Sequence, residues 1–276
     1  MIFMKTNIRL LFTACAAALV TGCTNLDVDV ESQYTEYPTN EIAVEAKMAD
    51  VYYQMRDVFG RRYMEAQALS SDEYTAVSYG GGWYDSGAYA HPSLHNYTYE
   101  DATIDWMGQL TSGITKANKI IIELGGNEAG AAVAPARAMR AFFHFILMDC
   151  WGDAPILDHA MAEDETIDRS PRADVARFIE SELKEIIPQL TDEVNANTYG
   201  KPTKWMAEAL LAKIYINWPV YTAASVDLYD AATAKNEKLN DCIALCDDII
   251  KSGKFNLGSM SYSKKFGPDN GSHVED

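Results

Sequence analysis

The chain has 276 residues, 48% of them hydrophobic, and a formal net charge of −17 at pH 7. An acidic surface of this kind repels the phosphate backbones of nucleic acids, which argues against nucleic acid as a partner. It also disfavours adsorption to anionic lipid, so attachment to a membrane would have to rely on acyl chains rather than on a basic patch.

The N-terminus has the pattern of a bacterial lipoprotein signal peptide. Lys5 and Arg9 precede the apolar run 10–20, which leads through small residues to Cys23. A basic region followed by an apolar one is typical of a secretory signal, and the run is too short to cross a bilayer. A cysteine directly after small residues resembles a lipobox, in which the thiol is acylated. We therefore expect residues 1–22 to be cleaved off and Cys23 to be lipidated.

An acidic tether over residues 23–40 is expected to follow the lipidated cysteine. Asp27, Asp29 and Glu31 lie near its beginning. This arrangement resembles the export signal that directs lipoproteins of the Bacteroidetes to the cell surface. The N-terminus therefore predicts a protein that is lipid-anchored in the outer membrane and faces the cell exterior, with its folded domain over residues 41–276.

Apolar periodicity predicts helices throughout this domain, and hence an all-α fold. The first helix, over 41–59, is expected to break at Gly60, and a short helical piece then leads to Ser70. The later helices are expected over residues 103–124, 136–148, 171–190, 203–217 and 236–251. Ser170 is expected to cap the third of these at its N-terminus.

The starts of the later helices recur at a nearly constant interval, which is close to the period of a tetratricopeptide repeat. This interval runs from helix to helix rather than from helix pair to helix pair, and the consensus residues of that repeat are absent. We therefore expect stacked helical hairpins, tetratricopeptide-like, with long elaborated loops.

The stretch Pro135–Ile156, PARAMRAFFHFILMDCWGDAPI, is the expected centre of the fold. Its polar residues Arg137, Arg140 and His144 lie at spacings of three and four, so they fall on one narrow stripe of a helix. The rest of the circumference is apolar, which predicts burial on several sides. Glycine and proline within residues 151–155 are expected to end the helix in a sharp turn.

Residues 74–102 form a long loop without helical or strand periodicity, and they contain four glycines, six tyrosines and Trp83. Long loops in compact domains are usually functional or disordered, and aromatic residues disfavour disorder. Sugars present C–H faces that stack on Trp and Tyr rings. The composition therefore favours ligand binding, although packing of Trp83 beneath its own loop is an equally good interpretation.

No motif for catalysis, cofactor binding or metal binding is found. His91 and His95 have the spacing of a zincin, but the glutamate that should follow the first histidine is absent. Neither a phosphate-binding glycine pattern nor Gly-x-Ser-x-Gly occurs. Cys150, Cys242 and Cys246 are expected to be small buried apolar residues. We therefore expect no enzyme activity and no cofactor.

Several stretches resemble the SusD/RagB family of outer-membrane nutrient-binding lipoproteins. ARAMRAFFHF at 136–145, running into WGDAPI at 151–156, is similar to the centre of that family. The Ala-Asn pair at 117–118 resembles a family helix, and so does GKPTKWMAEALLAKIYIN, although Lys201 stands where arginine is usual. Residues 264–276 resemble a segment from the middle of family members. The resemblance thus implies that this domain is the N-terminal portion of a longer protein.

This resemblance implies a fold of tetratricopeptide-like helix pairs and a function without chemistry. Family members capture a nutrient, in most cases an oligosaccharide, and pass it to a SusC-like, TonB-dependent outer-membrane transporter. The expected partners are therefore an oligosaccharide, that transporter and the membrane, through the lipid anchor.

The resemblance also points to the 74–102 loop as the ligand site. Trp83 and Tyr84 are expected to be stacking platforms for sugar rings. Polar or secondary contacts are expected from Asp72, Tyr79, Asp85 and Tyr89. Two alternatives stay open: a peptide-binding uptake lipoprotein of the same fold, and a scaffold or adhesion lipoprotein that binds no small ligand.

Overall fold

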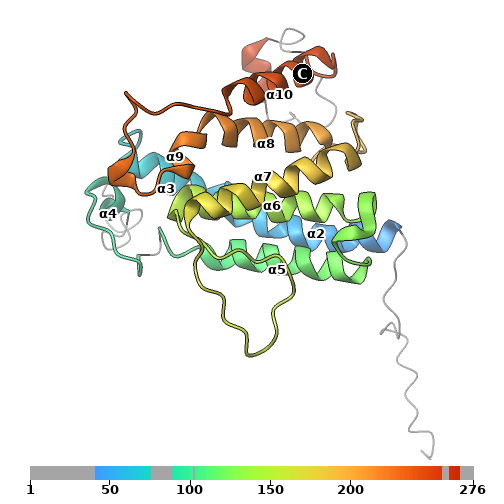
Figure 1. Ribbon diagram of the computed structural model, residues 1–276, viewed down its shortest axis with the longest axis horizontal. Coiled ribbons are helices and arrows are strands. Elements are labelled where there is room, and N and C mark those ends of the chain that lie inside the picture. The colour runs from blue at the N-terminus through green and yellow to red at the C-terminus, as the bar shows by residue number, and fades with distance from the viewer. Residues whose placement is uncertain (1–40, 76–88, 102, 257–260, 268–276) are drawn as a thin grey trace, which may run out of the picture. The chain divides into compact units, whose positions relative to one another are not determined.

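The computed structural model describes residues 41–75, 89–101, 103–256 and 261–267 (Figure 1). The expected signal peptide, tether and lipidation site at Cys23 lie outside these ranges. Within them the chain is helical, and its one β-type pairing is an isolated antiparallel bridge between Ala154 and Ser170. The prediction of an all-α fold is confirmed.

The helical elements follow one another along the chain, and consecutive helices pack together as in stacked hairpins. In this order α5, α6, α7, α8 and α10 each contact the next, and α2 packs on α5 (Figure 1). None of the helices within the described ranges combines the length and the apolar character that a membrane span requires. The elements are α2 (Glu41–Asp57), η1 (Val58–Arg62), α3 (Tyr63–Ser70), α4 (Ala90–Ser93), α5 (Met107–Glu123), η3 (Asn127–Ala132), α6 (Ala134–Trp151), α7 (Arg172–Ile186), η4 (Ile187–Gln189), α8 (Lys204–Ile216), α9 (Trp218–Thr222), η5 (Val226–Leu228), α10 (Leu239–Lys251) and η6 (Tyr262–Phe266).

The first helix does not break at Gly60, contrary to the prediction. The backbone passes from α2 through a π-helical turn, η1, directly into α3. In this turn the backbone N–H of Tyr63 donates to the carbonyl of Val58, five residues earlier. The wider turn keeps the backbone hydrogen-bonded across the glycine, so the helix continues where propensity alone favours a stop.

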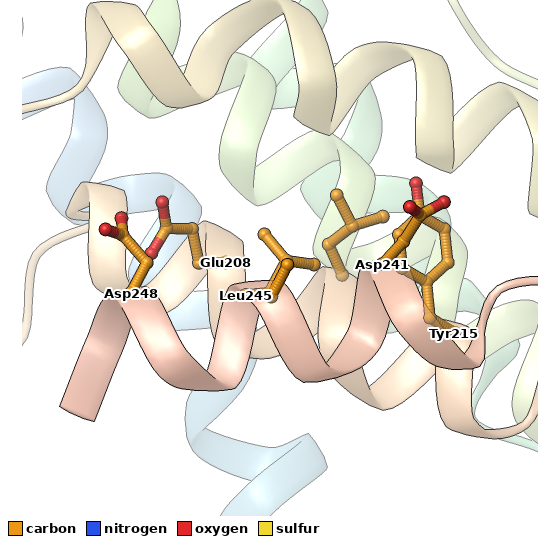
Figure 2. Close-up of a pocket in the computed structure, with 7 residues that line it drawn as sticks. Glu208, Tyr215, Asp241, Leu245 and Asp248 are labelled. Carbon is orange, nitrogen blue, oxygen red and sulfur yellow. The ribbon is translucent and has the colours of Figure 1, made fainter. Parts of the chain in front are cut away.

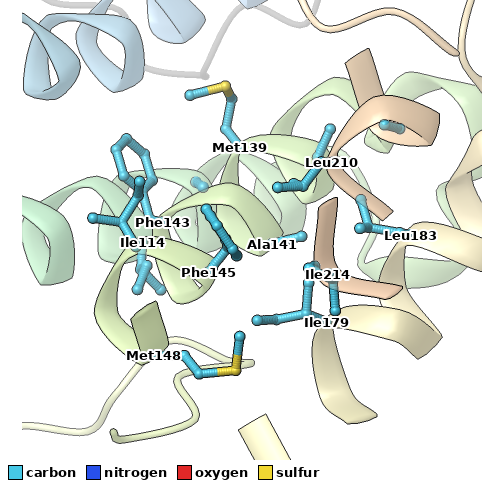
Figure 3. Packing of buried hydrophobic residues seen from close by; sticks show 14 of the residues in the cluster. Ile114, Met139, Ala141, Phe143, Phe145, Met148, Ile179, Leu183, Leu210 and Ile214 are labelled. Atoms are coloured by element: carbon cyan, nitrogen blue, oxygen red, sulfur yellow. The ribbon is translucent and has the colours of Figure 1, made fainter. Parts of the chain in front are cut away.

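The central helix α6 is buried over most of its length, as predicted. Phe143, Ile146 and Leu147 of this helix have at most 1% of their surface exposed. Each such side chain stabilises the fold by roughly 1.5–3 kcal/mol through burial. Figure 3 shows side chains of α5, α7 and α8 packed against those of α6. Among them are Ile114 of α5, Phe143, Phe145 and Met148 of α6, Ile179 and Leu183 of α7, and Leu210 and Ile214 of α8.

We expect Gly113→Ala to destabilise the fold by roughly 1–3 kcal/mol, because it overpacks the contact between α5 and α6. A Cβ atom at Gly113 would lie 2.6 Å from Cε2 of the buried Phe143 ring. The matched control is Gly108→Ala on the same helix, where a Cβ would meet nothing within 4 Å. Urea unfolding measures both free energies, and equal stability of the two variants would contradict the close approach.

The turn after α6 caps the next helix in an unexpected way. Gly152 adopts φ 76°, a left-handed conformation that suits glycine, and ends α6. Asp153 then accepts the backbone N–H of Arg172 at 2.9 Å, so Asp153 caps α7. Ser170, the predicted cap, is instead held by two backbone hydrogen bonds to Ala154, and its side chain makes no cap bond.

One further helix was not predicted, and two other helices begin later than predicted because side chains bond the residues before them. A short helix, α4, lies within the stretch 74–102, which was expected to be irregular. Residues 103–106 precede α5 as turns, in which Nε1 of Trp106 donates to the carbonyl of Thr103. Asn236 donates to the carbonyls of Tyr215 and Ile216, so α10 begins after it, at Leu239.

The prediction that three cysteines are buried is correct for one of them. Cys242 is buried between α10 and α8, and its thiol donates to the carbonyl of Ala212. Cys150 is half-buried, and Cys246, one turn after Cys242 on the same helix, is exposed. All three are free thiols.

The polar stripe of α6 does not face solvent. Arg137 and Arg140 are each 1% exposed and share the carboxylate of Glu182 on α7. Nη2 of Arg137 lies 2.6 Å from Oε1 of Glu182, and Nη2 of Arg140 lies 2.5 Å from Oε2. Glu185, which is more exposed, pairs with Arg137 at 2.8 Å. The two positive and two negative charges offset one another, and they join α6 to α7.

His144 and Asn118 extend this network to the loop that follows α6. Nε2 of His144 accepts the backbone N–H of Leu157 at 3.0 Å, so the ring proton lies on Nδ1 and bonds to the carbonyl of Arg140. The amide of Asn118, on α5, donates to the carbonyls of Leu157 and His159. The residues that carry the sequence resemblance therefore hold α5, α6, α7 and this loop together.

Candidate functional site

A cavity of about 320 Å³ lies at the C-terminal end of α6. It is lined by α3, by residues between 92 and 106, and by the last residues of α6. Its polar lining groups are Gln67, Ser70, Tyr97, Thr103 and Asp149. A largely apolar wall with a few convergent polar groups is the usual composition of a site for a small organic ligand.

Two tryptophans form the inner wall of this cavity. Trp106 is 1% exposed, and its indole N–H is already bonded to the carbonyl of Thr103 at 3.2 Å. The ring centroids of Trp106 and Trp151 lie 4.6 Å apart at an interplanar angle of 62°. Tyr63 meets Trp106 edge-on at 6.5 Å. These contacts fix the rings, so the wall is rigid.

Asp149 supplies the charged group of the site. Its carboxylate accepts the hydroxyl of Tyr221 at 2.6 Å and that of Tyr63 at 3.3 Å. Burial, with the charge of Asp149 as the second cause, raises the pKa of Tyr63 to about 12. Burial likewise raises the pKa of the neighbouring Cys150 to about 12, so this thiol stays protonated and is a poor nucleophile. The arrangement is suited to hydrogen bonding rather than to thiol chemistry.

Hydrogen bonds to Asp101 stabilise the segment that carries Tyr97 at the outer rim of the cavity. One oxygen of the Asp101 carboxylate is hydrogen-bonded to Nδ1 of His91 at 2.5 Å. The other oxygen accepts the backbone N–H of Thr98, also at 2.5 Å. The Thr98 N–H is the main cause, and His91 the next, of a lowered pKa of the Asp101 carboxyl. Ser93 ties the same segment to a backbone carbonyl of α3. This bracing leaves Tyr97 at the rim, 47% exposed.

The described residues include two of the six predicted ligand contacts. Tyr79, Trp83, Tyr84 and Asp85 lie outside the described residues. Asp72 is exposed, in the turn after α3, with φ 60°. Tyr89 is engaged by Arg61, whose guanidinium donates to the Tyr89 hydroxyl and lies 5.7 Å from its ring centroid. Neither Asp72 nor Tyr89 is among the residues that line the cavity.

Sequence reasoning did not identify Gln67, Ser70 or Asp149 as site residues. They come from α3 and α6, which are far apart in the chain. One signal was available: Asp149 lies directly before the cysteine and tryptophan that end the most apolar helix. A charged residue at the end of a buried helix needs partners, and here the hydroxyls of Tyr63 and Tyr221 provide them.

A second cavity, of about 290 Å³, lies between α8 and α10 (Figure 2). Figure 2 shows Glu208 beside Asp248 at one end and Asp241 beside Tyr215 at the other. Burial raises the pKa of Glu208, and the Tyr215 hydroxyl is bonded to Glu180 at 2.7 Å. Two of its three carboxylates, those of Glu208 and Asp248, pair with Lys204. The ring of Tyr215 is already in contact with Lys238 and Trp218, so the groove offers no free aromatic face and fits a sugar less well than the cavity at α6.

In the part of the chain that the structure describes, no group of three or more His, Cys, Asp or Glu side chains is positioned to hold a metal ion.

Comparison with known proteins finds similarity to one family. The profile of a family described as "Starch-binding associating with outer membrane" matches residues 26–216. A SusD-like protein of Bacteroides ovatus is 26% identical, over 78% of this chain and 40% of its own length. This chain thus spans less than half of that curated relative.

Solved structures agree on the fold. A SusD-like protein of Bacteroides fragilis has a TM-score of 0.63 at 19% identity, over 82% of this chain and 40% of its own. A laminarin-binding SusD-like protein has a TM-score of 0.56 at 22% identity, over 67% of this chain and 42% of its own. Because the family match extends over more than half of the chain, and the helical fold is shared, this protein belongs to the SusD-like family.

Proposed function

We propose that this protein is a cell-surface lipoprotein that binds an oligosaccharide and delivers it to a SusC-like, TonB-dependent outer-membrane transporter. The observation that carries the proposal is the cavity at the end of α6, with its fixed aromatic wall and its few polar groups. The family description as starch-binding and the laminarin-binding relative support a glycan as the ligand.

In the proposed complex, the exposed ring of Tyr97 stacks on the C–H face of a sugar at the rim of the cavity. Hydroxyl groups of the sugar hydrogen-bond to Gln67, Ser70 and Asp149, which have acceptor capacity beyond the bonds they already make. Neutral hydroxyls suit these groups, and no bond in the ligand needs to break. The predicted roles of Trp83 and Tyr84 as stacking platforms, and of Asp72, Tyr79, Asp85 and Tyr89 as further contacts, remain part of the proposal.

The anchoring part of the proposal rests on the N-terminal sequence. Cleavage after residue 22 and acylation of Cys23 would hold the protein at the outer membrane, and the acidic segment 23–40 would serve as its tether. This agrees with the family description as associating with the outer membrane. Because the net charge of −17 disfavours adsorption to anionic lipid, the acyl chains are the proposed attachment to the membrane.

Tyr97→Ala is expected to weaken glycan binding two- to tenfold, the effect of losing about 0.5–1.5 kcal/mol of stacking. The test uses the whole mature protein without its lipid cysteine, in native gels that contain plant, host or microbial polysaccharides. Calorimetry follows with the polysaccharide that retards it. The control is Tyr53→Ala, because this tyrosine of α2 is 56% exposed but does not line the cavity. It is expected to bind like the unaltered protein.

The outcomes distinguish the alternatives. Binding that survives in Tyr97→Ala but is lost in Trp83→Ala would place the site in the 74–102 loop rather than at the cavity. Failure to bind any polysaccharide would contradict the proposal and favour a peptide ligand. If neither glycan nor peptide binds, the scaffold or adhesion alternative would be favoured.

A further inference from the structure

A third cavity, of about 420 Å³, adjoins the candidate glycan site. Asp149, Cys150 and Trp151 line both cavities, so the two share the C-terminal turn of α6. The lining of the third cavity is completed mainly by Arg172, at the start of α7, and by residues at the end of α8 and in α9. A ligand in the first cavity could therefore extend into this one.

Two cations of this cavity have no carboxylate partner among the described residues. Nε of Arg172 donates to the backbone carbonyl of Tyr221 at 3.3 Å, and its guanidinium forms no ion pair with a residue of the described ranges. The ammonium of Lys213 is likewise without an acidic partner there and lies 5.7 Å from the ring centroid of Phe145. In a chain with 40 acidic and 23 basic residues, cations generally find carboxylates, as Arg137 does.

The acidic groups nearby are already engaged. Asp153 accepts the backbone N–H of Arg172, and Asp149 accepts two tyrosine hydroxyls. Arg172, Lys213 and Asp149 together give the cavity one net positive charge. The positive end of the helix dipole at the start of α7 is already offset by the carboxylates of Asp153 and Asp174. Among the residues that line the cavity, the two cations nevertheless outnumber the one carboxylate.

We propose that this cavity is an anion subsite, and that the oligosaccharide bound next to it carries a carboxylate or sulfate group. The guanidinium of Arg172 presents two N–H donors in the geometry that such oxyanions accept. Lys213 adds a second, mobile charge at the exposed edge. The ligand class is therefore an acidic glycan, containing uronic acid or sulfated sugar. This inference rests on the proposed function.

The test compares three probes on the whole mature protein: polygalacturonate, whose charges are carboxylates alone, dextran sulfate, whose charges are sulfates alone, and neutral laminarin. Arg172→Gln and Lys213→Gln are each expected to weaken binding of an acidic probe by about tenfold or more, since each removes a charge-assisted hydrogen bond. Binding of the neutral probe should change less than twofold. The control is Lys119→Gln, an exposed lysine of α5 that does not line the cavity.

Each outcome decides a separate point. A loss confined to one acidic probe tells carboxylate from sulfate. Laminarin binding that exceeds or equals acidic binding, with both variants unaffected, would overturn the anion subsite and leave glycan binding intact. If no probe and no other polysaccharide binds, the proposed function fails and the inference fails with it. Lys213 is exposed, so Lys213→Gln keeps the test valid even if Arg172→Gln does not fold.

Discussion

Glu182→Gln is expected to destabilise the protein by roughly 3–5 kcal/mol, the usual effect of removing one partner of a buried ion pair. The substitution takes away the carboxylate that Arg137 and Arg140 share, and both arginines are 1% exposed. Arg137 would keep Glu185, but Arg140 would keep only neutral acceptors, among them Asn118 at 2.9 Å. A buried guanidinium would then be left without a counter-charge. Urea unfolding measures the loss.

The matched control is Glu185→Gln, which removes a carboxylate from the same arginine. The side chain of Glu185 is 49% exposed, so its loss should cost less than about 1 kcal/mol. Glu182→Asp keeps the negative charge on a shorter side chain. Its free energy of unfolding should therefore lie between those of Glu182→Gln and Glu185→Gln. If Glu182→Gln is no less stable than Glu185→Gln, the buried pairing does not hold α6 to α7 in the way described.

Acidification from pH 7 to 5 is expected to destabilise the fold through His144, by about 2 kcal/mol. Its pKa is lowered from the ordinary 6.5 to about 4, chiefly by burial. Above pH 6.5 the ring is neutral in both the folded and the unfolded chain. Below this pH the unfolded chain takes up a proton that the folded chain does not. Stability is therefore lost as pH falls, and at pH 4 the loss would reach roughly 3 kcal/mol.

The comparison with His144→Gln isolates this effect. Glutamine cannot take up the proton. The free energy of unfolding of the variant should therefore fall less steeply between pH 7 and 5 than that of the unaltered protein. His159 acts in the opposite direction, because bonds to Asp158 and Glu165 raise its pKa. It is present in both proteins, so its contribution cancels in the difference. Equal slopes for the two proteins would show that His144 takes up its proton as readily in the folded chain as in the unfolded chain, which would contradict the lowered pKa.

These two predictions concern the residues that carry the family resemblance. Arg137, Arg140, His144 and Asn118 all make buried contacts with protein groups, so their described role is to join helices. The proposed ligand contacts lie at the end of α6 instead. Stability and binding can therefore be tested by separate substitutions.

The sequence by itself determined the helical class and most of the core. Leu110, Ile114, Ala117 and Ile121 recur on one face of α5, and all four are buried. Such periodicity depends on neighbours within a turn or two, so it can be read locally. The stop at Gly152 is local for the same reason, since a left-handed φ depends on the residue itself.

Only the tertiary structure decided which distant groups meet. Asp153 caps a helix that begins 19 residues later, and Glu182 pairs with arginines at separations of 42 and 45 residues. Asp149 reaches Tyr63 across a separation of 86 residues, and the cavity exists because that approach brings α3 to the end of α6. From the sequence alone, any of the 40 acidic residues could have been the ion-pair partner of Arg137 and Arg140. Contacts of this range depend on how whole helices pack, which no local pattern records.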